Sequence, residues 1–351
     1  MSKPTVFNVS CPLPSKKGSF VQLAHGGGGK LMHELIESVF LPAFENPFLL
    51  QRHDSTSVEV PKGRLAVTTD SYVVNPLFFP GGDIGTLAVN GTVNDLAMSG
   101  ARPLFLTAAF IIEEGFPIED LSKIVLSMQK MAQAADIAII AGDTKVVDRG
   151  KGDGVFINTT GIGVIEHDQT ISPTAVKSGD SILLCGDIGR HGISIMTKRS
   201  GIEFDTTIVS DCASVHLPVQ KLLKEGIPLH CLRDLTRGGL ATALNEIAFM
   251  AGLRFEVEEL AIPVREEVRA ACEILGFDPL YVANEGAFVA ILQATEARRA
   301  LRLLQEWFPG RETAIIGRVS EATGSIVTLT NSLGTKRVLD MLTGEQLPRI
   351  C

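Results

Sequence analysis

The chain has 351 residues, of which 45% are hydrophobic and 21% charged, and its formal net charge is −8. This composition is typical of a globular protein with sizeable cores, and the length predicts about two domains. An acidic chain without basic tracts argues against a nucleic-acid-binding protein, and no apolar run reaches the ~18 residues that a membrane span needs.

Six cysteines are spread along the chain without a C-x-x-C pair or a histidine at zinc-ligand spacing. The N-terminal sequence MSKPTVFNVS has no apolar signal-peptide segment. Widely spaced thiols in a chain of this size are typical of a reduced, cytoplasmic protein. We therefore expect a cytoplasmic location, no membrane association and no nucleic-acid partner.

Strand and helix patterns alternate in both halves of the chain. Apolar residues and composition predict helices at residues 31–40, 83–98, 119–135, 237–252 and 266–276. Apolar runs predict strands at residues 64–74, 137–147, 154–165, 181–189, 314–320 and 325–330, and we expect the second of these to end in a Gly-Asp turn. The alternation predicts two α/β-type domains with mixed sheets.

The domain boundary is expected near ISPTAVKSGD, residues 171–180, because this segment contains proline and glycine between two strand patterns. We expect a flexible N-terminal segment at residues 1–20, a first domain at 21–170 and a second domain at 171–335. Residues 336–351 are expected to form a mobile tail that carries Cys351.

Four consecutive glycines, Gly26 to Gly29, precede Lys30. The Walker phosphate loop does not fit, because Leu31 follows the lysine and Ala24 stands where the first glycine is required. Bare backbone N–H groups beside an ammonium group can still hold phosphate oxygens. A flexible hinge is an equally good alternative.

The predicted helix at residues 83–98 carries Asp83, Asn90 and Asn94 along one stripe. A polar stripe could simply face water, but solvent-facing stripes usually carry lysine and glutamate, and this one has neither. The carboxamides therefore favour a buried ligand surface.

Four aspartates stand at predicted element boundaries, namely Asp54, Asp70, Asp95 and Asp143. Any one of them alone is best explained as a turn or helix-cap residue. Together with the glycine-rich loop and the asparagine stripe, converging carboxylates predict a site for Mg²⁺ and a triphosphate.

The motifs TTDS, GGDIGTLAVNGTVNDLAMSGARP and AGDTKVV, in this order, resemble the aminoimidazole-ribonucleotide synthetase-like (PurM-like) superfamily of ATP-using enzymes. The longer stretch that begins NPLFFP, the segment IIEEG and the terminal PRIC are similar to one family within it, the HypE hydrogenase maturation factors. The resemblance runs from about residue 26 to residue 351.

The resemblance implies an α+β, PurM-like fold in which the sheets of two N-terminal domains pair in a homodimer and ATP with Mg²⁺ lies between subunits. It implies ATP-dependent dehydration of a carbamoyl group on the C-terminal cysteine to a thiocyanate. This thiocyanate supplies the cyanide ligands of [NiFe]-hydrogenase iron. A HypF carbamoyltransferase would load the cysteine, and a HypC–HypD complex would receive the cyanide.

Site residues can be carried over by position. The resemblance makes Asp54, Asp70, Asp95 and Asp143 ligands of Mg²⁺ and phosphate, and it places Lys30, Asp83, Asn90, Asn94 and Gly142 in the nucleotide cleft. Lys145 and Glu285 match the lysine and glutamate at the reacting carbamoyl group, and Cys351 becomes the carrier. His191 is a further candidate for the substrate end of the cleft, with a packed or surface histidine as the alternative.

These roles suit the chemistry, because an amide loses its oxygen only after that oxygen becomes part of a phosphate. A general base must then take protons from nitrogen, and Glu285 after an apolar segment is expected to have the raised pKa that suits this task. Lys145 can balance the developing negative charge. Two alternatives stay open: another PurM-like kinase or ligase, and a non-enzymatic nucleotide-binding carrier.

Cys351 is the last residue of the chain, so it does not fit a prenylation signal, which places its cysteine fourth from the end. A disordered terminus is the simple alternative. With the distant cleft in view, we expect Cys351 to be a tethered substrate arm rather than a catalytic nucleophile.

Overall fold

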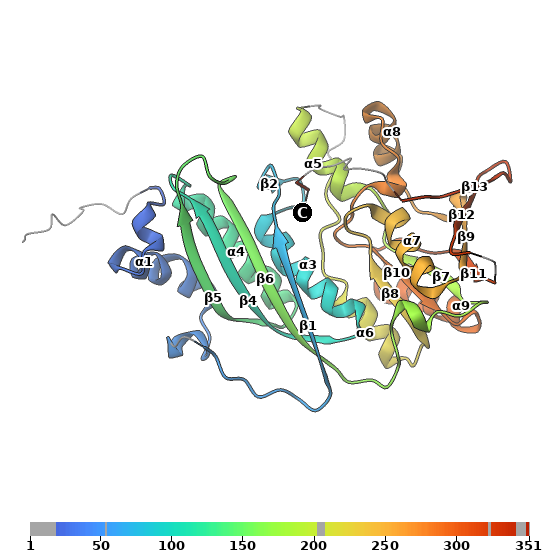
Figure 1. Cartoon of the computed structure of the whole chain (residues 1–351), viewed down its shortest axis with the longest axis horizontal. Coiled ribbons are helices and arrows are strands. Elements are labelled where there is room, and N and C mark those ends of the chain that lie inside the picture. Colours follow the sequence, from blue (N-terminus) through green and yellow to red (C-terminus); the bar gives the residue numbers. More distant parts are fainter. Residues whose placement is uncertain (1–18, 53–54, 202–207, 322–323, 342–348, 351) are drawn as a thin grey trace, which may run out of the picture.

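The computed structural model describes residues 19–52, 55–201, 208–321, 324–341 and 349–350. Two predicted site residues, Asp54 and Cys351, therefore lie outside the described residues. The described chain folds around two β-sheets, with a two-stranded hairpin of β2 (Phe78–Phe79) and β3 (Gly82–Asp83) between them (Figure 1).

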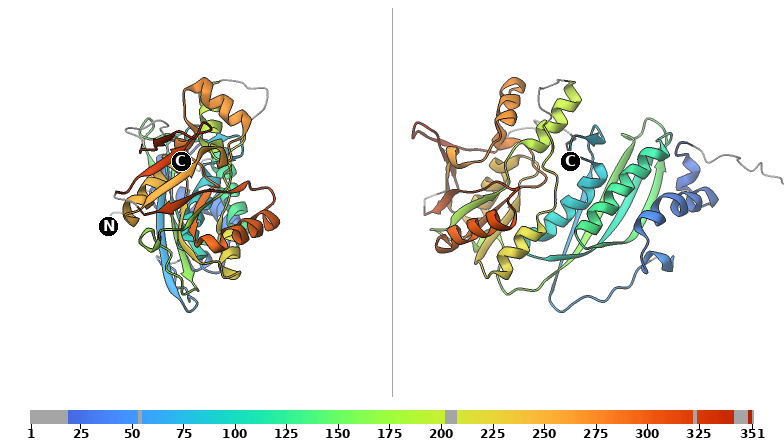
Figure 2. Two further views of the ribbon diagram at one scale, coloured as in Figure 1. Left: turned by 90° about the vertical axis from the view of Figure 1, so that its right-hand side faces the viewer. Right: turned by 180° about the vertical axis from the view of Figure 1, so that it is seen from behind.

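The first sheet has four strands in the order β1-β6-β4-β5. Their bounds are β1 (Arg64–Tyr72), β4 (Arg102–Glu113), β5 (Ala138–Val147) and β6 (Val155–Ile165). Strands β4 and β5 are parallel and the other pairs antiparallel, so the sheet is mixed. Helices α3 (Ile84–Met98) and α4 (Ile118–Ala134) cover one face, and no helix of the described residues lies on the opposite face (Figure 2).

The second sheet has seven strands in the order β13-β12-β9-β11-β7-β10-β8, and only the pair β12 and β9 is parallel. Its strands are β7 (Ser181–Cys185), β8 (Leu229–Asp234), β9 (Arg254–Glu258), β10 (Phe288–Leu292), β11 (Thr313–Ser320), β12 (Val327–Thr330) and β13 (Lys336–Val338). The accompanying helices are α5 (Arg190–Ser200), α6 (His216–Lys224), α7 (Gly239–Ala251), α8 (Glu266–Leu275) and α9 (Ala294–Trp307).

The glycine-rich segment and two short helices lie over the β5 side of the first sheet (Figure 1). Helix α1 (Lys30–Leu35) continues through a π-helical turn at Ile36–Phe40 into α2 (Leu41–Phe44). Gly26 packs directly on β5, since a Cβ at Gly26 would lie 2.5 Å from the backbone nitrogen of Val146. This close approach ties the glycine-rich segment to the strand that carries Lys145.

Helix α3 is the element that joins the two halves, because it contacts β1 and β6 on one side and β8 and α6 on the other. Asp83 caps its N-terminus by accepting a hydrogen bond from the backbone N–H of Thr86 (2.9 Å). Gly91 allows the helix to approach β1, since a Cβ there would lie 2.4 Å from the hydroxyl oxygen of Tyr72. The helix is therefore buried on nearly all sides, as its apolar composition requires.

The predicted mixed-sheet α+β architecture is confirmed. The predicted Gly-Asp turn is wrong: Gly142 and Asp143 lie inside β5, which stays paired with β4 as far as Val147. Strand pairing over nine residues outweighs the local turn preference of Gly142 and Asp143. Glycine suits position 142 because a Cβ there would lie 2.7 Å from the carbonyl oxygen of Ala108 on β4.

The second sheet extends past residue 335, the expected end of the second domain, because β13 at Lys336–Val338 forms its edge. In the described part of the chain, no helix has the length and apolar character needed to cross a membrane.

Candidate active site

The asparagine stripe on α3 faces protein from the second half of the chain. Asn94 accepts a hydrogen bond from the backbone N–H of Val215 (2.8 Å) and donates to the carbonyl oxygens of Ala213 (3.2 Å) and Glu285 (3.4 Å). Asn90 donates to the Sγ atom of Cys212 (3.7 Å). Both carboxamides are buried, so the stripe does not face water, and Asn94 serves to hold the second-half segments against α3.

Asp83, at the start of the same stripe, uses its carboxylate within the protein. One oxygen accepts from Thr86, and the other accepts from the hydroxyl of Ser127. Burial raises the pKa of Asp83, and the hydrogen bond from Ser127 opposes that shift. The geometry assigns Asp83 a capping role, and its nucleotide contact stays a prediction.

Glu285 is only 3% exposed, and its Oε1 atom has no hydrogen-bond partner among the described residues. Burial raises the pKa of its carboxyl well above the ordinary range, and the charges of Asp234, Asp211, Asp70 and Asp95 raise it further. A buried carboxyl group with a raised pKa and an unpaired oxygen has the properties of a proton-transferring group.

The backbone around Glu285 is held by Asp211, whose carboxylate accepts from the N–H groups of Glu285 (3.2 Å) and Gly286 (2.9 Å). Gly286 permits this packing, because a Cβ there would lie 2.0 Å from the carbonyl oxygen of Asp211. Asp211 is itself buried, and burial raises its pKa. The Glu285 loop is thus fixed in place before any ligand arrives.

Asp70 and Asp95, two of the four predicted metal ligands, lie near this carboxyl group. Asp95 on α3 accepts from the Thr68 hydroxyl of β1 (2.9 Å). Burial raises the pKa of Asp95, the Thr68 bond lowers it, and the neighbouring Asp70 charge raises it again. Asp234, at the end of β8, joins them: burial and the charge of Asp95 raise its pKa to about 7, and its Oδ2 atom also lacks a partner among the described residues.

Asp234 and Asp211 were not predicted as site residues. Asp234 stands just before the predicted helix at residues 237–252, and the segment SDCAS around Asp211 matches none of the motifs that predicted the site. Both acquire their importance from burial next to Glu285, which local patterns do not reveal.

Lys145, Asp143 and Gly142 lie elsewhere on the first sheet, on strand β5. Asp143 and Lys145 form an ion pair (3.0 Å) and are both more than half exposed. The sheet register aligns Lys145 with the exposed Ile111, which places both on the open face. Lys30, at the start of α1, is also exposed and pairs only loosely with Glu34 (3.7 Å).

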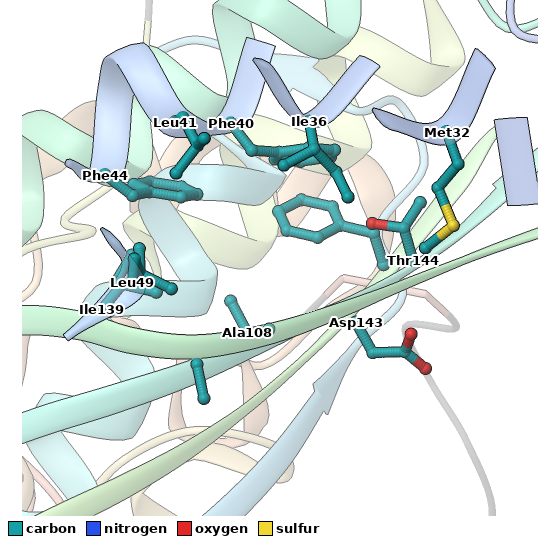
Figure 3. Close-up of a pocket in the computed structure, with 13 residues that line it drawn as sticks. Met32, Ile36, Phe40, Leu41, Phe44, Leu49, Ala108, Ile139, Asp143 and Thr144 are labelled. Atoms are coloured by element: carbon teal, nitrogen blue, oxygen red, sulfur yellow. The ribbon is translucent and has the colours of Figure 1, made fainter. Parts of the chain in front are cut away.

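An apolar cavity of about 130 Å³ opens beside Gly142 and Asp143, between the N-terminal helices and the sheet (Figure 3). Phe40, Phe44 and Ile36 line it from above, and the Asp143 carboxylate points away from these side chains at its rim (Figure 3). A cavity of this kind can bury a flat apolar ring next to exposed charged groups.

Among the described residues, the predicted carboxylates Asp70 and Asp95 therefore do not converge with Asp143 within one chain. Asp70 aligns across the sheet with the fully buried Thr159, on the helix-covered face of edge strand β1, whereas Asp143 lies on the open face of edge strand β5. Three strand spacings separate these edges, about 14 Å. Among the described residues, no group of three or more potential ligands is arranged to hold a metal ion. Asp70 and Asp95 still fit Mg²⁺, which often binds through one or two carboxylates with waters and phosphates.

His191 is fully buried and binds the end of the chain rather than facing a cleft. Its Nε2 atom donates to the carbonyl oxygen of Ile350 (2.6 Å), and its Nδ1 atom accepts from the Ser210 hydroxyl (2.8 Å). Burial lowers the pKa of His191 to about 4, so the imidazole is neutral. The residue just before Cys351 is thus held next to the Ser210–Cys212 segment.

Comparison with known proteins places this arrangement in a class. Residues 52–165 match the family model of the AIR synthase related protein N-terminal domain, and residues 177–330 match that of its C-terminal domain. The fold and these matches define a two-domain protein of the AIR synthase related class.

The relatives narrow the class further. The carbamoyl dehydratase HypE of Azotobacter vinelandii is 51% identical over 339 residues, which cover 97% of this chain and 99% of that protein. A crystal structure of the hydrogenase maturation protein HypE in complex with ATP has a TM-score of 0.90 and 47% identity, over 94% of this chain and 99% of that one. A HypE–HypF complex structure matches with a TM-score of 0.77 and 46% identity, over 90% and 100% of the two chains. This chain belongs to the HypE family of carbamoyl dehydratases.

Proposed function

We propose that this chain uses ATP to dehydrate an S-carbamoyl group on its own Cys351 to a thiocyanate, which supplies cyanide ligands during [NiFe]-hydrogenase maturation. The relatives named carbamoyl dehydratase support the reaction class, and the HypE structure in complex with ATP supports the use of this nucleotide. The observation that carries the proposal is the buried carboxyl group of Glu285, whose Oε1 atom has no partner among the described residues and which is connected through the Ser210–Cys212 segment to the bound Ile350.

In this reaction the carbonyl oxygen of the carbamoyl group attacks the γ-phosphorus of ATP, and ADP leaves. The C–O bond then breaks, phosphate departs with that oxygen, and a C≡N bond forms. Both nitrogen protons are lost, and they balance as protons on the released phosphate and the medium. Glu285 is the group placed to take a proton from nitrogen, and its raised pKa makes it a strong base once ionised.

We further propose that Lys145 reaches this site from a second copy of the chain. Within one chain, Lys145 lies on the open face at β5, whereas Glu285 lies among residues at the β1 side. The open face carries exposed apolar residues, including Leu65, Val67 and Ile111. Pairing two such faces would bury them and bring the β5 edge of one subunit toward the β1 edge of its partner. The positive charge would also favour ionised Glu285.

The same arrangement would complete the nucleotide site. The apolar cavity beside Gly142 suits the adenine ring, and the glycine-rich segment with Lys30 suits phosphate oxygens. Asp70 and Asp95 would hold Mg²⁺ together with Asp54 and, across the dimer, Asp143. When bound, Mg²⁺ would supply positive charge to the phosphates.

HypF and the HypC–HypD complex are the proposed partners. The solved HypE–HypF complex supports the first of these pairings. We propose that HypF loads Cys351 with the carbamoyl group and that HypC–HypD accepts the cyanide.

Mass spectrometry of the C-terminal peptide tests the dehydration. After incubation with HypF, carbamoyl phosphate and ATP–Mg²⁺, we expect the carbamoyl adduct on Cys351 to lose one water. The Glu285→Gln variant should accept the carbamoyl group and keep it. A wild-type adduct that never loses water with ATP present would refute the proposed reaction.

A further inference from the structure

The two described residues before Cys351 are bound to the body of the protein by their backbone. Ile350 forms an antiparallel bridge with Val74, and the N–H of Asn75 donates to the carbonyl oxygen of Arg349 (3.1 Å). In Figure 1, α5 lies beside the hairpin that begins with β2. Residues Arg349 and Ile350 thus pair with the segment that follows β1.

Helix α5 supplies the second side of this binding site. The Arg199 guanidinium donates to the carbonyl oxygens of both Asn75 (2.9 Å) and Arg349 (2.9 Å). His191, two helical turns earlier, donates to the carbonyl oxygen of Ile350. A carbonyl oxygen only accepts, so Nε2 of His191 carries the hydrogen and Nδ1 accepts from Ser210.

The side chains of the tail are also held. Arg349 forms an ion pair with Asp153 (2.7 Å) in the loop between β5 and β6, and Ile350 is only 4% exposed. Arg349 adopts a left-handed backbone conformation with φ of 56°, which is unfavourable for a residue other than glycine. A chain end adopts this conformation only where surrounding contacts outweigh its cost.

We propose that Val74, Asn75, Asp153, His191 and Arg199 form a tail seat that sets the register of the last residues and so fixes where the Cys351 group enters the active site. This inference rests on the proposed role of Cys351 as the carrier. His191 and Arg199 are then positioning residues, since they act on the carbonyl groups of the two preceding residues. A one-residue shift of the tail would break both of these contacts.

The tail seat and the Glu285 loop share one segment. Ser210, which donates to His191, accepts a hydrogen bond from the N–H of Cys212 (3.0 Å). Asp211 lies between them and holds the backbone of Glu285. The position of the bound tail and the position of the carboxyl group are thus set by neighbouring residues of a single segment.

Residues from both halves of the chain form the tail seat. Val74, Asn75 and Asp153 come from the first, and His191 and Arg199 come from the second. The ion pair of Arg349 with Asp153 lies at the surface, so it can open without exposing a core. Buried contacts at Ile350 and an exposed ion pair at Arg349 together suit a tail that must be released to partners and return to one register.

The test uses the full-length protein and the rate at which N-ethylmaleimide alkylates Cys351, followed by mass spectrometry of the C-terminal peptide. The seated tail should slow alkylation. Arg199→Ala should speed it about tenfold, because a charged donor to a carbonyl is lost. Lys198→Ala, at the exposed neighbouring position on α5, is the matched control and should stay within about twofold of the wild type.

The ion pair gives an independent variant series. Asp153→Arg and Arg349→Asp should each speed alkylation, and the double variant should restore protection because the charges are exchanged. Asp148→Ala, at an exposed aspartate in the same loop, should change nothing. The tail seat is refuted if the Arg199 and Asp153 variants react no faster than their controls, or if the double variant stays as fast as the single ones.

A catalytic readout separates positioning from structure. In carbamoylated protein, Arg199→Lys should retain part of the single-turnover dehydration rate that Arg199→Ala loses, while ATP affinity and melting temperature stay unchanged. Equal loss in both variants together with unfolding would assign Arg199 a merely structural role. Seat-dependent alkylation without any dehydration would refute the proposed function and leave the tail seat standing.

Discussion

Asp234 and Glu285 each hold one carboxyl oxygen out of contact with water. Each has one oxygen without a hydrogen-bond partner in the described part of the chain. Native proteins rarely keep such atoms, because an unpaired buried polar group costs ~1–3 kcal/mol. The arrangement is therefore expected at a site that handles protons or binds a cation, and it is expected to cost stability.

The stability cost should depend on pH, and Asp234→Asn measures it. The folded protein raises the pKa of Asp234 from 3.8 to about 7, so between these values it binds more protons than the unfolded chain. Stability from this group is present below pH ~4 and is lost as the pH rises toward ~7. Asp234→Asn removes this loss of stability. The free energy of unfolding of the variant should therefore exceed that of the metal-free wild type by an amount that grows with pH, to about 4 kcal/mol at most.

Urea unfolding of both proteins between pH 5 and pH 8 checks this. The difference in the free energy of unfolding between variant and wild type cancels the contribution of His191, which both proteins share. The lowered pKa of His191 gives the opposite pH dependence, because its contribution to stability is present above pH ~6.5 and is lost as the pH falls toward 4. A variant that is uniformly less stable than the wild type would contradict the buried-charge interpretation.

Among the elements, α3 shows what the sequence predicts well. Residues 83–98 combine a capping aspartate, small residues and an apolar surround, and the helix forms at Ile84–Met98. The burial of its asparagines against protein was not predictable, because Asn94 meets residues more than a hundred positions away in the chain. Contacts of that separation depend on how the two halves pack.

Strand β5 shows the opposite case. Gly142 and Asp143 have local turn chemistry, and only pairing with β4 keeps the strand extended through them. Likewise, the sequence singled out Glu285 through the resemblance, but its acidic neighbours Asp211 and Asp234 become recognisable only when burial is known. His191 was a candidate for the substrate end of the cleft, with a packed histidine as the alternative, and the structure shows it packed and bound to the carbonyl oxygen of Ile350.

Asn94→Ala tests whether α3 holds the two halves together. The variant leaves the N–H of Val215 and two carbonyl oxygens without their partner in a buried site. We expect a loss of about 2 kcal/mol in the free energy of unfolding. Gln220→Ala removes a single, partly buried bond between the halves, to Gly100, and should cost less than about 1 kcal/mol. Equal stability of the two variants in urea unfolding would contradict this role of Asn94.

At the scale of the whole molecule, the predicted site residues of one chain fall into two separate groups. The β5 side offers the glycine-rich segment, the apolar cavity, Asp143 and Lys145. The β1 side carries the tail seat and the neighbouring carboxyl groups of Asp70, Asp95, Asp234 and Glu285. Asp143 and Lys145 lie on the open face at the β5 edge, whereas Asp70 lies on the helix-covered face at the β1 edge, so no change of side-chain conformation brings them together. In the proposed dimer, a second chain with its open face against the first would supply what each side lacks.

Mixed dimers test whether Lys145 acts across subunits. Lys145→Ala and Glu285→Gln should each be inactive alone. A mixture refolded or exchanged at equal amounts forms mixed dimers with one intact site, so about a quarter of the wild-type dehydration rate should return. A mixture of Glu285→Gln with Glu285→Ala is the control and should stay inactive, because neither chain supplies the carboxyl group. No recovery in the first mixture, with dimers present by light scattering, would place Lys145 and Glu285 in the same chain's site and contradict the proposed pairing of open faces.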